Sequence, residues 1–541
     1  MEELRKIYGD SYLRYVLVLD DSEGQLSEGQ QQAVSLLQSF ATLGTGDESE
    51  SLRAFNLAQR LNRYVPDYGM TVSSVLRLQS GGELKALEHS DDLTQELLVL
   101  ARDNWPIYLL PPPKEELRDL AVMQTYLHPS SQEFLRLALR DDAICKLFHA
   151  APEQLPDSTK LFEIQSEIVY SSGRGGSYQL VMLPDTILNN ARCRQLLKGD
   201  PDNLDTYLAC VIEVLGEARE LAQGKEITIP VLVGLANMTV PDGARVVTEL
   251  GIIRSPRMED EHLLNPFDET QTQTQLTAVL ETTQPLKILG KRDWNVARRE
   301  ASIGTYFKKF MPLFEQYQQR SERNVILMRY ALLLASDKTL LAPAPIIRTE
   351  FDPLQPLLNR SWMPFVGQPS GISVLDADAA ERTRVWAARV EQQHSAQLDL
   401  GVRRLVAAAS TRLDPIDSFI DAVICWENMF GSSSESTFRI CGAMACLLEP
   451  FDSAKRLTEY ESLKKLYGIR SKVVHCVTEL TGREASDYRT KAVRYALDAM
   501  GLLYDYPDLL KTKGSAERGR DVLLASGLPV EDEAESSKLN E

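Results

Sequence analysis

Apolar residues recur at spacings of three to four positions through about the first 160 residues, which predicts amphipathic helices. The clearest segments are 27–44, SEGQQQAVSLLQSFATLG, and 50–65, ESLRAFNLAQRLNRYV. Three consecutive prolines, 111–113, stop regular structure and predict a connection. Residues 1–170 are therefore expected to form a mainly helical N-terminal region.

The pattern changes toward strands between about 224 and 350, where β-branched residues partly alternate with polar ones. The segments 227–235, 244–253 and 274–289 (ITIPVLVGL, ARVVTELGII and TQLTAVLETTQPLKIL) carry this pattern, separated by Pro, Asp and Gly. Upstream, 171–178, SSGRGGSY, lacks the Lys-Ser/Thr ending of a phosphate-binding loop and predicts a plain turn. We expect a sheet-containing α+β domain over 171–350 and a proline-rich linker over 351–380.

From about 380 the helical periodicity returns, and five helices are predicted within a bundle over 381–515. They are expected over 378–410, 415–431, 434–449, 456–480 and 485–506. Asp414 before Pro415 is typical of a helix start, Gly431 of a helix end, and Pro507 is expected to end the last helix. The acidic residues 516–541 are predicted to be a disordered tail. The fold class predicted for the whole chain is α+β.

Composition narrows the function classes. The 541 residues include seven cysteines without a Cys-x-x-Cys pair and six dispersed histidines, so neither a metal site nor a cofactor is expected. An apolar stretch long enough to span a membrane and an N-terminal secretory signal are both missing, which predicts a cytoplasmic protein. The net charge of −18 argues against indiscriminate nucleic-acid binding, so a nucleic-acid site would require a local basic patch.

The most informative stretch is Tyr467-Gly-Ile-Arg-Ser-Lys-Val-Val-His475. Its arginine, Arg470, could hold a phosphate with two hydrogen bonds, and its histidine could move a proton to or from a ribose oxygen near neutral pH. Five helical residues separate the two side chains by roughly 140°, so spacing alone does not bring them together. A curled arginine or a second, two-fold-related chain could complete the site, and the spacing favours the dimer.

The region from about 400 to 505 resembles the Apea-like HEPN domain, a branch of the HEPN superfamily of small helical bundles. Three segments carry the resemblance: the helix of Asp417, Asp421 and Glu427, the run Ser436-Thr-Phe-Arg439-Ile, and the signature helix Leu463 to His475. The last corresponds to the superfamily's Arg-x(4–6)-His motif, with the polar Ser471 directly after the arginine. Cys476 departs from the family, which commonly has Gly there, and a larger side chain could narrow the cleft.

The resemblance implies a dimeric, metal-independent endoribonuclease of bacterial defence (anti-phage, abortive infection) or toxin type. Arg470 and His475 would be catalytic, while Glu427, Arg439 and Ser471 would support the site. The ribose 2′-hydroxyl would be the nucleophile, leaving 2′,3′-cyclic phosphate ends. The N-terminal region would bind a phage or regulatory trigger, and tRNA and mRNA are candidate substrates. Two alternatives remain open: a non-catalytic HEPN module that dimerises or binds a nucleotide as a sensor or scaffold, and an antitoxin-like subunit of a larger complex.

Charge around the motif supports an RNA site. Residues 454–494 contain ten basic and five acidic side chains, an excess of five positive charges in an acidic chain. Within this segment Lys464, Lys465 and Lys472 are the candidate RNA contacts, although a solvated helix face would show the same composition.

Overall fold

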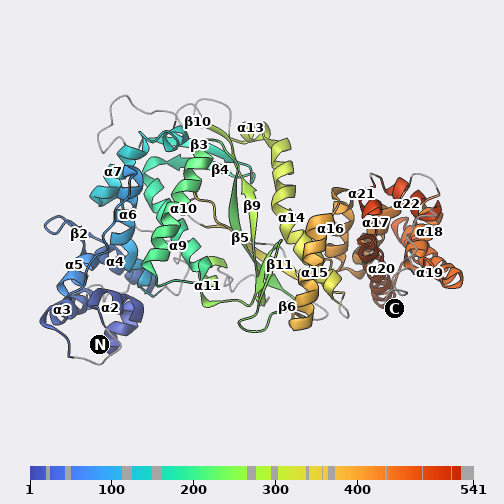
Figure 1. The fold of residues 1–541 in the computed structure, drawn as a ribbon, viewed down its shortest axis with the longest axis horizontal. Helices are drawn as coiled ribbons and strands as arrows, with labels where there is room; N and C mark the ends of the chain where they lie inside the picture. Colours follow the sequence, from blue (N-terminus) through green and yellow to red (C-terminus); the bar gives the residue numbers. More distant parts are fainter. Residues whose placement is uncertain are drawn as a thin grey trace, which may run out of the picture.

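The computed structural model describes most of the chain. The described residues are 1–19, 25–42, 50–111, 125–148, 161, 163–264, 276–293, 303–336, 340–355, 358–362, 372–432, 435–477, 479–512 and 514–524. The fold class is α+β, as predicted. The N-terminal helices and the C-terminal bundle lie at opposite ends of the molecule, with the sheets between them (Figure 1).

The N-terminal part is helical. Its elements are α1 (Glu2–Tyr8), α2 (Asp10–Leu17), α3 (Glu28–Thr42), α4 (Glu50–Leu61), β1 (Tyr64–Val65), β2 (Met70–Thr71), α5 (Val72–Gln79), α6 (Asp92–Asn104), η1 (Trp105–Leu109), η3 (Thr125–Leu127), α7 (Pro129–Ala138) and η4 (Ile144–Leu147). The two segments with the clearest apolar periodicity are α3 and α4, and their apolar positions help to form a buried core with Trp105 and Phe134.

The middle of the chain contains the sheets. Its elements are β3 (Gln165–Tyr170), β4 (Gly175–Gln179), η5 (Leu180–Met182), α9 (Leu183–Lys198), α10 (Leu204–Ala222), β5 (Ile227–Ala236), β6 (Met238–Thr239), β7 (Arg245–Thr248), β8 (Gly251–Arg254), α11 (Met258–Leu264), β9 (Ala278–Leu286), β10 (Ile288–Asp293), α13 (Ile303–Lys308), α14 (Met311–Ala335), β11 (Ala344–Glu350), β12 (Asn359–Trp362) and β13 (Ser373–Val374).

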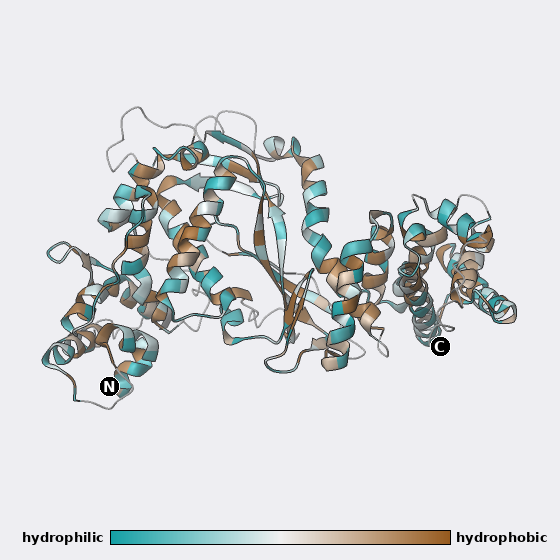
Figure 2. Cartoon of the chain, in the orientation of Figure 1, coloured by the Kyte–Doolittle hydropathy of each residue, from teal (hydrophilic) through white to brown (hydrophobic). Residues whose placement is uncertain are grey.

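Six of these strands form an antiparallel sheet in the order β12-β11-β5-β9-β8-β7, and β10-β3-β4 form a smaller one. The strand segments predicted at 227–235, 244–253 and 274–289 correspond to β5, the β7–β8 hairpin, and β9 with β10. The turn predicted at 171–178 is shorter than expected, because residues 175–178 already belong to β4. Hydrophobic residues, coloured brown in Figure 2, make up much of the central strands.

Strand β5 joins two hydrophobic cores. Because side chains alternate across a strand, Ile227, Ile229, Val231 and Val233 share one face. The first two pack with the N-terminal helices, and the next two pack in a core that continues through α14 into the bundle. The sheet therefore belongs to both halves of the molecule.

The C-terminal part is entirely helical. Its elements are α15 (Ala377–Gln393), η6 (Ala396–Leu398), α16 (Asp399–Ala408), α17 (Pro415–Phe430), α18 (Ser436–Leu448), α19 (Ser453–Val474), α20 (Gly482–Leu503), α21 (Pro507–Lys511) and α22 (Ser515–Leu524). The predicted boundaries of α17 are confirmed. Asp414 accepts a hydrogen bond from the Ile416 N–H at 2.7 Å, and the helix ends before Gly431.

Three expectations for this part need correction. The single helix predicted over 378–410 is two helices, because the chain breaks at His394, whose ring lies within hydrogen-bonding distance of the Tyr504 hydroxyl (3.1 Å) and the Asp399 carboxylate (2.9 Å). The range predicted as a linker, 351–380, contains β12 and β13. Part of the predicted tail is α22, and residues 525–541 lie outside the described residues.

The last predicted helix also ends earlier than Pro507. Helix α20 stops at Leu503, and Pro507 instead occupies the first turn of α21, a position where the missing N–H of proline costs nothing. Among the described residues, no helix combines the length and the low polarity that a membrane span requires.

Candidate active site

Helix α19 carries the Arg–His motif and lies at the outer end of the bundle (Figure 1). Asp452 caps its start by accepting hydrogen bonds from the N–H groups of Ala454 and Lys455, both at 3.0 Å. Its only fully buried side chains in this structure are Leu463, Leu466 and Tyr467. Most of the surface of α19 is therefore accessible to solvent or to another molecule.

Arg470 is held in place from the neighbouring helix α17. Its guanidinium donates to Glu427 Oε2 at 3.2 Å, and the other carboxylate oxygen accepts from the Tyr467 hydroxyl at 2.9 Å. Tyr467 and Arg470 are three residues apart and so share one face of α19. Glu427 thereby fixes the orientation of Arg470, which is the supporting position expected for it.

This contact leaves most of the arginine's hydrogen-bonding capacity unused. A guanidinium has five N–H donors, and the Nε of Arg470 is buried with no hydrogen-bond partner among the described residues. The side chains of Arg470 and Glu427 are 20% and 29% exposed. Burial raises the pKa of the Tyr467 phenol, so the hydroxyl stays protonated and remains a donor to Glu427 at neutral pH. An anion that reaches Arg470 would meet free N–H groups beside one fixed carboxylate.

His475 lies where α19 ends. Its N–H donates to the Ser471 carbonyl at 3.1 Å, and the next two N–H groups, of Cys476 and Val477, donate to the carbonyls of Val473 and Lys472. These bonds close the helix in a Schellman motif, with Cys476 in the left-handed conformation at φ 56°. The His475 side chain is exposed, and the described residues provide no hydrogen bond or ion pair to it. The structure thus does not pair His475 with Arg470 within one chain.

The other predicted site residues are less closely connected to this pair. Ser471 contributes its carbonyl to the helix end, and Arg439 on α18 is half-buried without a side-chain hydrogen bond among the described residues. Lys465 and Lys472 are exposed, whereas Lys464 forms an ion pair with Glu461 at 3.3 Å. Lys464 is thus partly neutralised by a neighbour on its own helix.

An open groove of about 560 Å³ lies beside Glu427. It is lined by Glu427, Gly431, Ser432, Ser436, Ile440, Tyr467, Ser515 and Ala516. No local sequence pattern predicted a role for these serines or for Tyr467. The helical spacing of Tyr467 and Arg470 was the one available signal, whereas Ser515 and Ala516 come from a helix whose residues were predicted to lie mainly in the tail.

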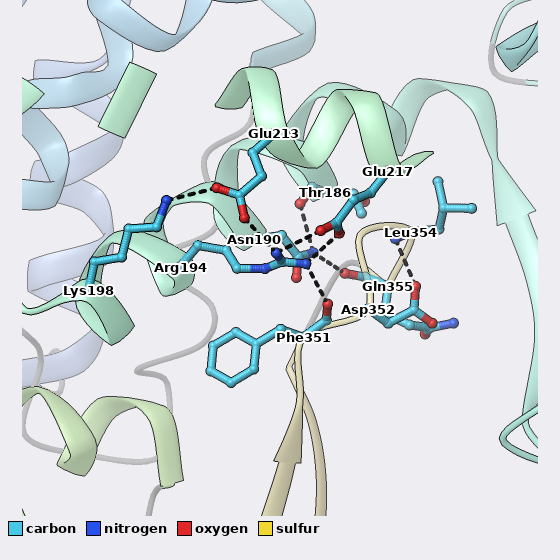
Figure 3. Close-up of polar contacts among 10 residues, drawn as sticks. All are labelled: Thr186, Asn190, Arg194, Lys198, Glu213, Glu217, Phe351, Asp352, Leu354 and Gln355. Atoms are coloured by element: carbon cyan, nitrogen blue, oxygen red, sulfur yellow. Dashed lines mark hydrogen bonds and ion pairs between the residues drawn. The ribbon is translucent and has the colours of Figure 1, made fainter. Parts of the chain in front are cut away.

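A second group of ionisable side chains is buried far from α19, between α9, α10 and the loop after β11 (Figure 3). Arg194, only 2% exposed, donates to Glu217 at 2.9 and 2.5 Å and to the Phe351 carbonyl at 3.1 Å. Next to it, burial raises the pKa of Asp352 to about 7. Because the carboxylate of Glu217 neutralises the charge of Arg194, we interpret this cluster as a structural contact that holds α9, α10 and the loop after β11 together.

The described part of the chain contains no group of three or more His, Cys, Asp or Glu side chains arranged to hold a metal ion. Comparisons of the chain with protein-family models, curated proteins and solved structures gave no match.

Proposed function

We propose that this protein is a metal-independent endoribonuclease of bacterial defence or toxin type, in which Arg470 binds the scissile phosphate and His475 transfers a proton. The proposal combines the resemblance of residues 400–505 to the Apea-like HEPN domain with the local geometry. The observation that carries it is a guanidinium oriented by Glu427 on the same helix as an accessible imidazole. The ribose 2′-hydroxyl would attack the phosphorus, and the 5′-oxygen would leave.

The proposed enzyme acts as a homodimer. Residues 470 and 475 are separated by roughly 7 Å along a helix axis and by about 140° around it, so they diverge within one chain. A two-fold axis near the exposed surface of α19 would place His475 of one copy opposite Arg470 of the other. The RNA would enter between the two copies, near Lys465 and Lys472. The N-terminal region would bind the phage or regulatory trigger that releases the activity.

The test is RNA cleavage by the full-length protein in the presence of EDTA. His475→Ala is expected to reduce the rate by 10²- to 10⁴-fold, the usual contribution of a positioned proton-transfer group. His89→Ala, which alters an exposed histidine of the N-terminal region, is the matched control and is expected to cleave like the wild type. The products should carry 2′,3′-cyclic phosphate and 5′-hydroxyl ends, and 2′-deoxy substitution at the cleaved position should block the reaction.

A second candidate function is favoured by one observation, the ion pair between Arg470 and Glu427, which gives the arginine a structural partner. In that case the bundle would be a non-catalytic module for dimerisation or nucleotide binding. This alternative predicts that His475→Ala and wild type behave alike, and that neither cleaves RNA when the trigger is present.

A further inference from the structure

The groove beside Glu427 has the lining of a small-molecule site. Its walls combine the carboxylate of Glu427 and the hydroxyls of Ser432, Ser436 and Ser515 with the apolar surfaces of Ile440 and Tyr467. Its volume of about 560 Å³ leaves room for a nucleobase, although the groove is open to solvent on one side. The groove adjoins Arg470 through Glu427, which contacts both.

The chemistry of the groove favours a ligand with hydrogen-bond donors. A carboxylate only accepts, and each of its two oxygens has two lone pairs. In Glu427 each oxygen receives one protein donor, Tyr467 on one side and Arg470 on the other, so one lone pair on each oxygen stays free. Because Glu427 lines the groove, its carboxylate can offer two adjacent acceptors to a ligand there. A phosphate inside the groove would meet this carboxylate and no lysine or arginine among the lining residues, so the phosphate is expected on the Arg470 side of Glu427 instead.

We propose that this groove binds a guanine base of the RNA, whose N1–H and exocyclic N2–H groups donate to the two oxygens of Glu427. This inference rests on the proposed function, because it identifies the base next to the phosphate at Arg470. Guanine is the base that presents two adjacent donors on its pairing edge. Adenine would direct its N1 lone pair at the carboxylate, and uracil and cytosine would each place a carbonyl or a ring-nitrogen acceptor there.

Binding of short oligonucleotides tests the assignment without requiring cleavage. The probes are four 2′-fluoro RNA tetranucleotides, which cannot be cleaved through a 2′-hydroxyl and which differ at one position in carrying G, A, C or U. Fluorescence anisotropy with the full-length dimeric protein is expected to show at least tenfold tighter binding of the G probe, the discrimination that a good bidentate contact to a base supplies.

Two variants sharpen the test. Glu427→Gln presents one acceptor and one donor, which no longer match the two adjacent donors of guanine, so the preference for the G probe is expected to be lost. Ala516→Trp places a bulky ring in the groove and is expected to abolish the preference, which keeps the test informative if the first variant fails to fold. Glu517→Trp, an exposed neighbour outside the groove lining, is the matched control and should retain the G preference.

The outcomes separate this inference from the proposed function. Equal affinity of the wild type for all four probes overturns the guanine site, even if the protein cleaves RNA. A G preference that is lost in Glu427→Gln and in Ala516→Trp but kept in Glu517→Trp supports the site, even if no RNA is cleaved and the ribonuclease proposal fails. A G preference that both groove variants leave unchanged also overturns the assignment, because the base would then be recognised elsewhere.

Discussion

Cys476, directly after His475, occupies the position at which α19 leaves the helical conformation. Its φ of 56° is left-handed, and the two N–H groups that close the Schellman motif belong to it and to Val477. The left-handed conformation costs an L-residue with a Cβ roughly 1 kcal/mol more in free energy than it costs glycine. Cys476 is exposed and is not part of the groove lining beside Glu427, and the expectation that its size narrows the cleft at His475 stays a prediction. The glycine common in HEPN proteins would relieve backbone strain here.

Cys476→Gly is therefore expected to stabilise the end of α19 by about 0.5–1 kcal/mol, less than the full relief because glycine is more flexible in the unfolded chain. Hydrogen exchange of the amides of residues 475–477 would measure this as a slowing of roughly two- to fivefold. Cys476→Ala keeps a Cβ in the same conformation and should exchange like the wild type. If glycine and alanine variants exchange at the same rate, the strain argument fails.

Some residues of the candidate site could be identified from the sequence, and others could not. Glu427 was identified through the resemblance, and the structure places it against Arg470. Tyr467 was not assigned a role, because a tyrosine on an amphipathic helix most often belongs to a core, and here it is both nearly buried and bonded to Glu427. Two of the groove serines, Ser432 and Ser436, are close in sequence, but Ser515 comes from α22, and its proximity to them depends on tertiary packing that no local pattern encodes.

Between elements, the loop after β11 contains a buried carboxyl, Asp352, that forms no ion pair with the residues that the structure describes. Asp352 is 5% exposed and accepts a hydrogen bond from the Leu354 N–H at 3.0 Å. Burial is the main reason why its pKa rises to about 7. The charges of Glu350 and Glu217 add to the increase, and Arg174 opposes it. The folded protein therefore retains a proton that the unfolded chain loses near pH 4.

The sign of the pH dependence follows from this retained proton. Below about pH 4 both states are protonated, and the stabilisation is complete. As pH rises from 4 through 7 this stabilisation of the folded state is lost, because the unfolded chain releases the proton and the folded protein keeps it. Ionising the buried carboxyl would cost on the order of a few kcal/mol. Asp352→Asn keeps the acceptor for Leu354 and is expected to raise the melting temperature relative to wild type at pH 8, with little difference at pH 4.

A matched variant at another buried carboxyl extends this test. Asp185, at the start of α9, accepts hydrogen bonds from the N–H and hydroxyl of Thr125, and burial also raises its pKa to about 7. Thermal unfolding at several pH values should show each Asp→Asn substitution removing part of the decline between pH 5 and 8, and the double variant removing more. A wild-type decline retained in both single variants would contradict the role of these two groups.

Whether a segment forms a helix or a strand was largely predictable from the sequence, whereas the interruptions within helical segments were not. Alternation and apolar periodicity identified β5, the β7–β8 hairpin, β9 and the bundle helices, because these patterns record which face is buried. The interruption between α15 and α16 could not be predicted, since the segment has no proline or glycine from His394 to Leu400. It depends on the contact of His394 with Tyr504, a residue 110 positions away. Long-range contacts of this kind override local propensity.

At the scale of the molecule, the buried core does not stop where the sheet ends. Residues of β5, β8 and β9 belong to the same buried cluster as residues of α14 to α20, and the N-terminal helices form a different cluster with α9 and α10. Helix α14 packs against β9 and also against α15 and α16. A change in the sheet can therefore reach the bundle through packed side chains, the kind of connection that a trigger bound by the N-terminal region would require.

Substitutions in the two cores should therefore destabilise different sets of elements. Met328 on α14 is fully buried in the core shared by sheet and bundle, so Met328→Ala is expected to cost about 2–4 kcal/mol. Because the packing is continuous, hydrogen exchange should accelerate in both β9 and α16. Leu97→Ala on α6, equally buried but in the N-terminal core, should accelerate exchange in α6 and α10 and leave α16 unchanged. Acceleration confined to α14 and α16 in Met328→Ala would show instead that the bundle opens independently of the sheet, and a trigger would then need another route to Arg470 and His475.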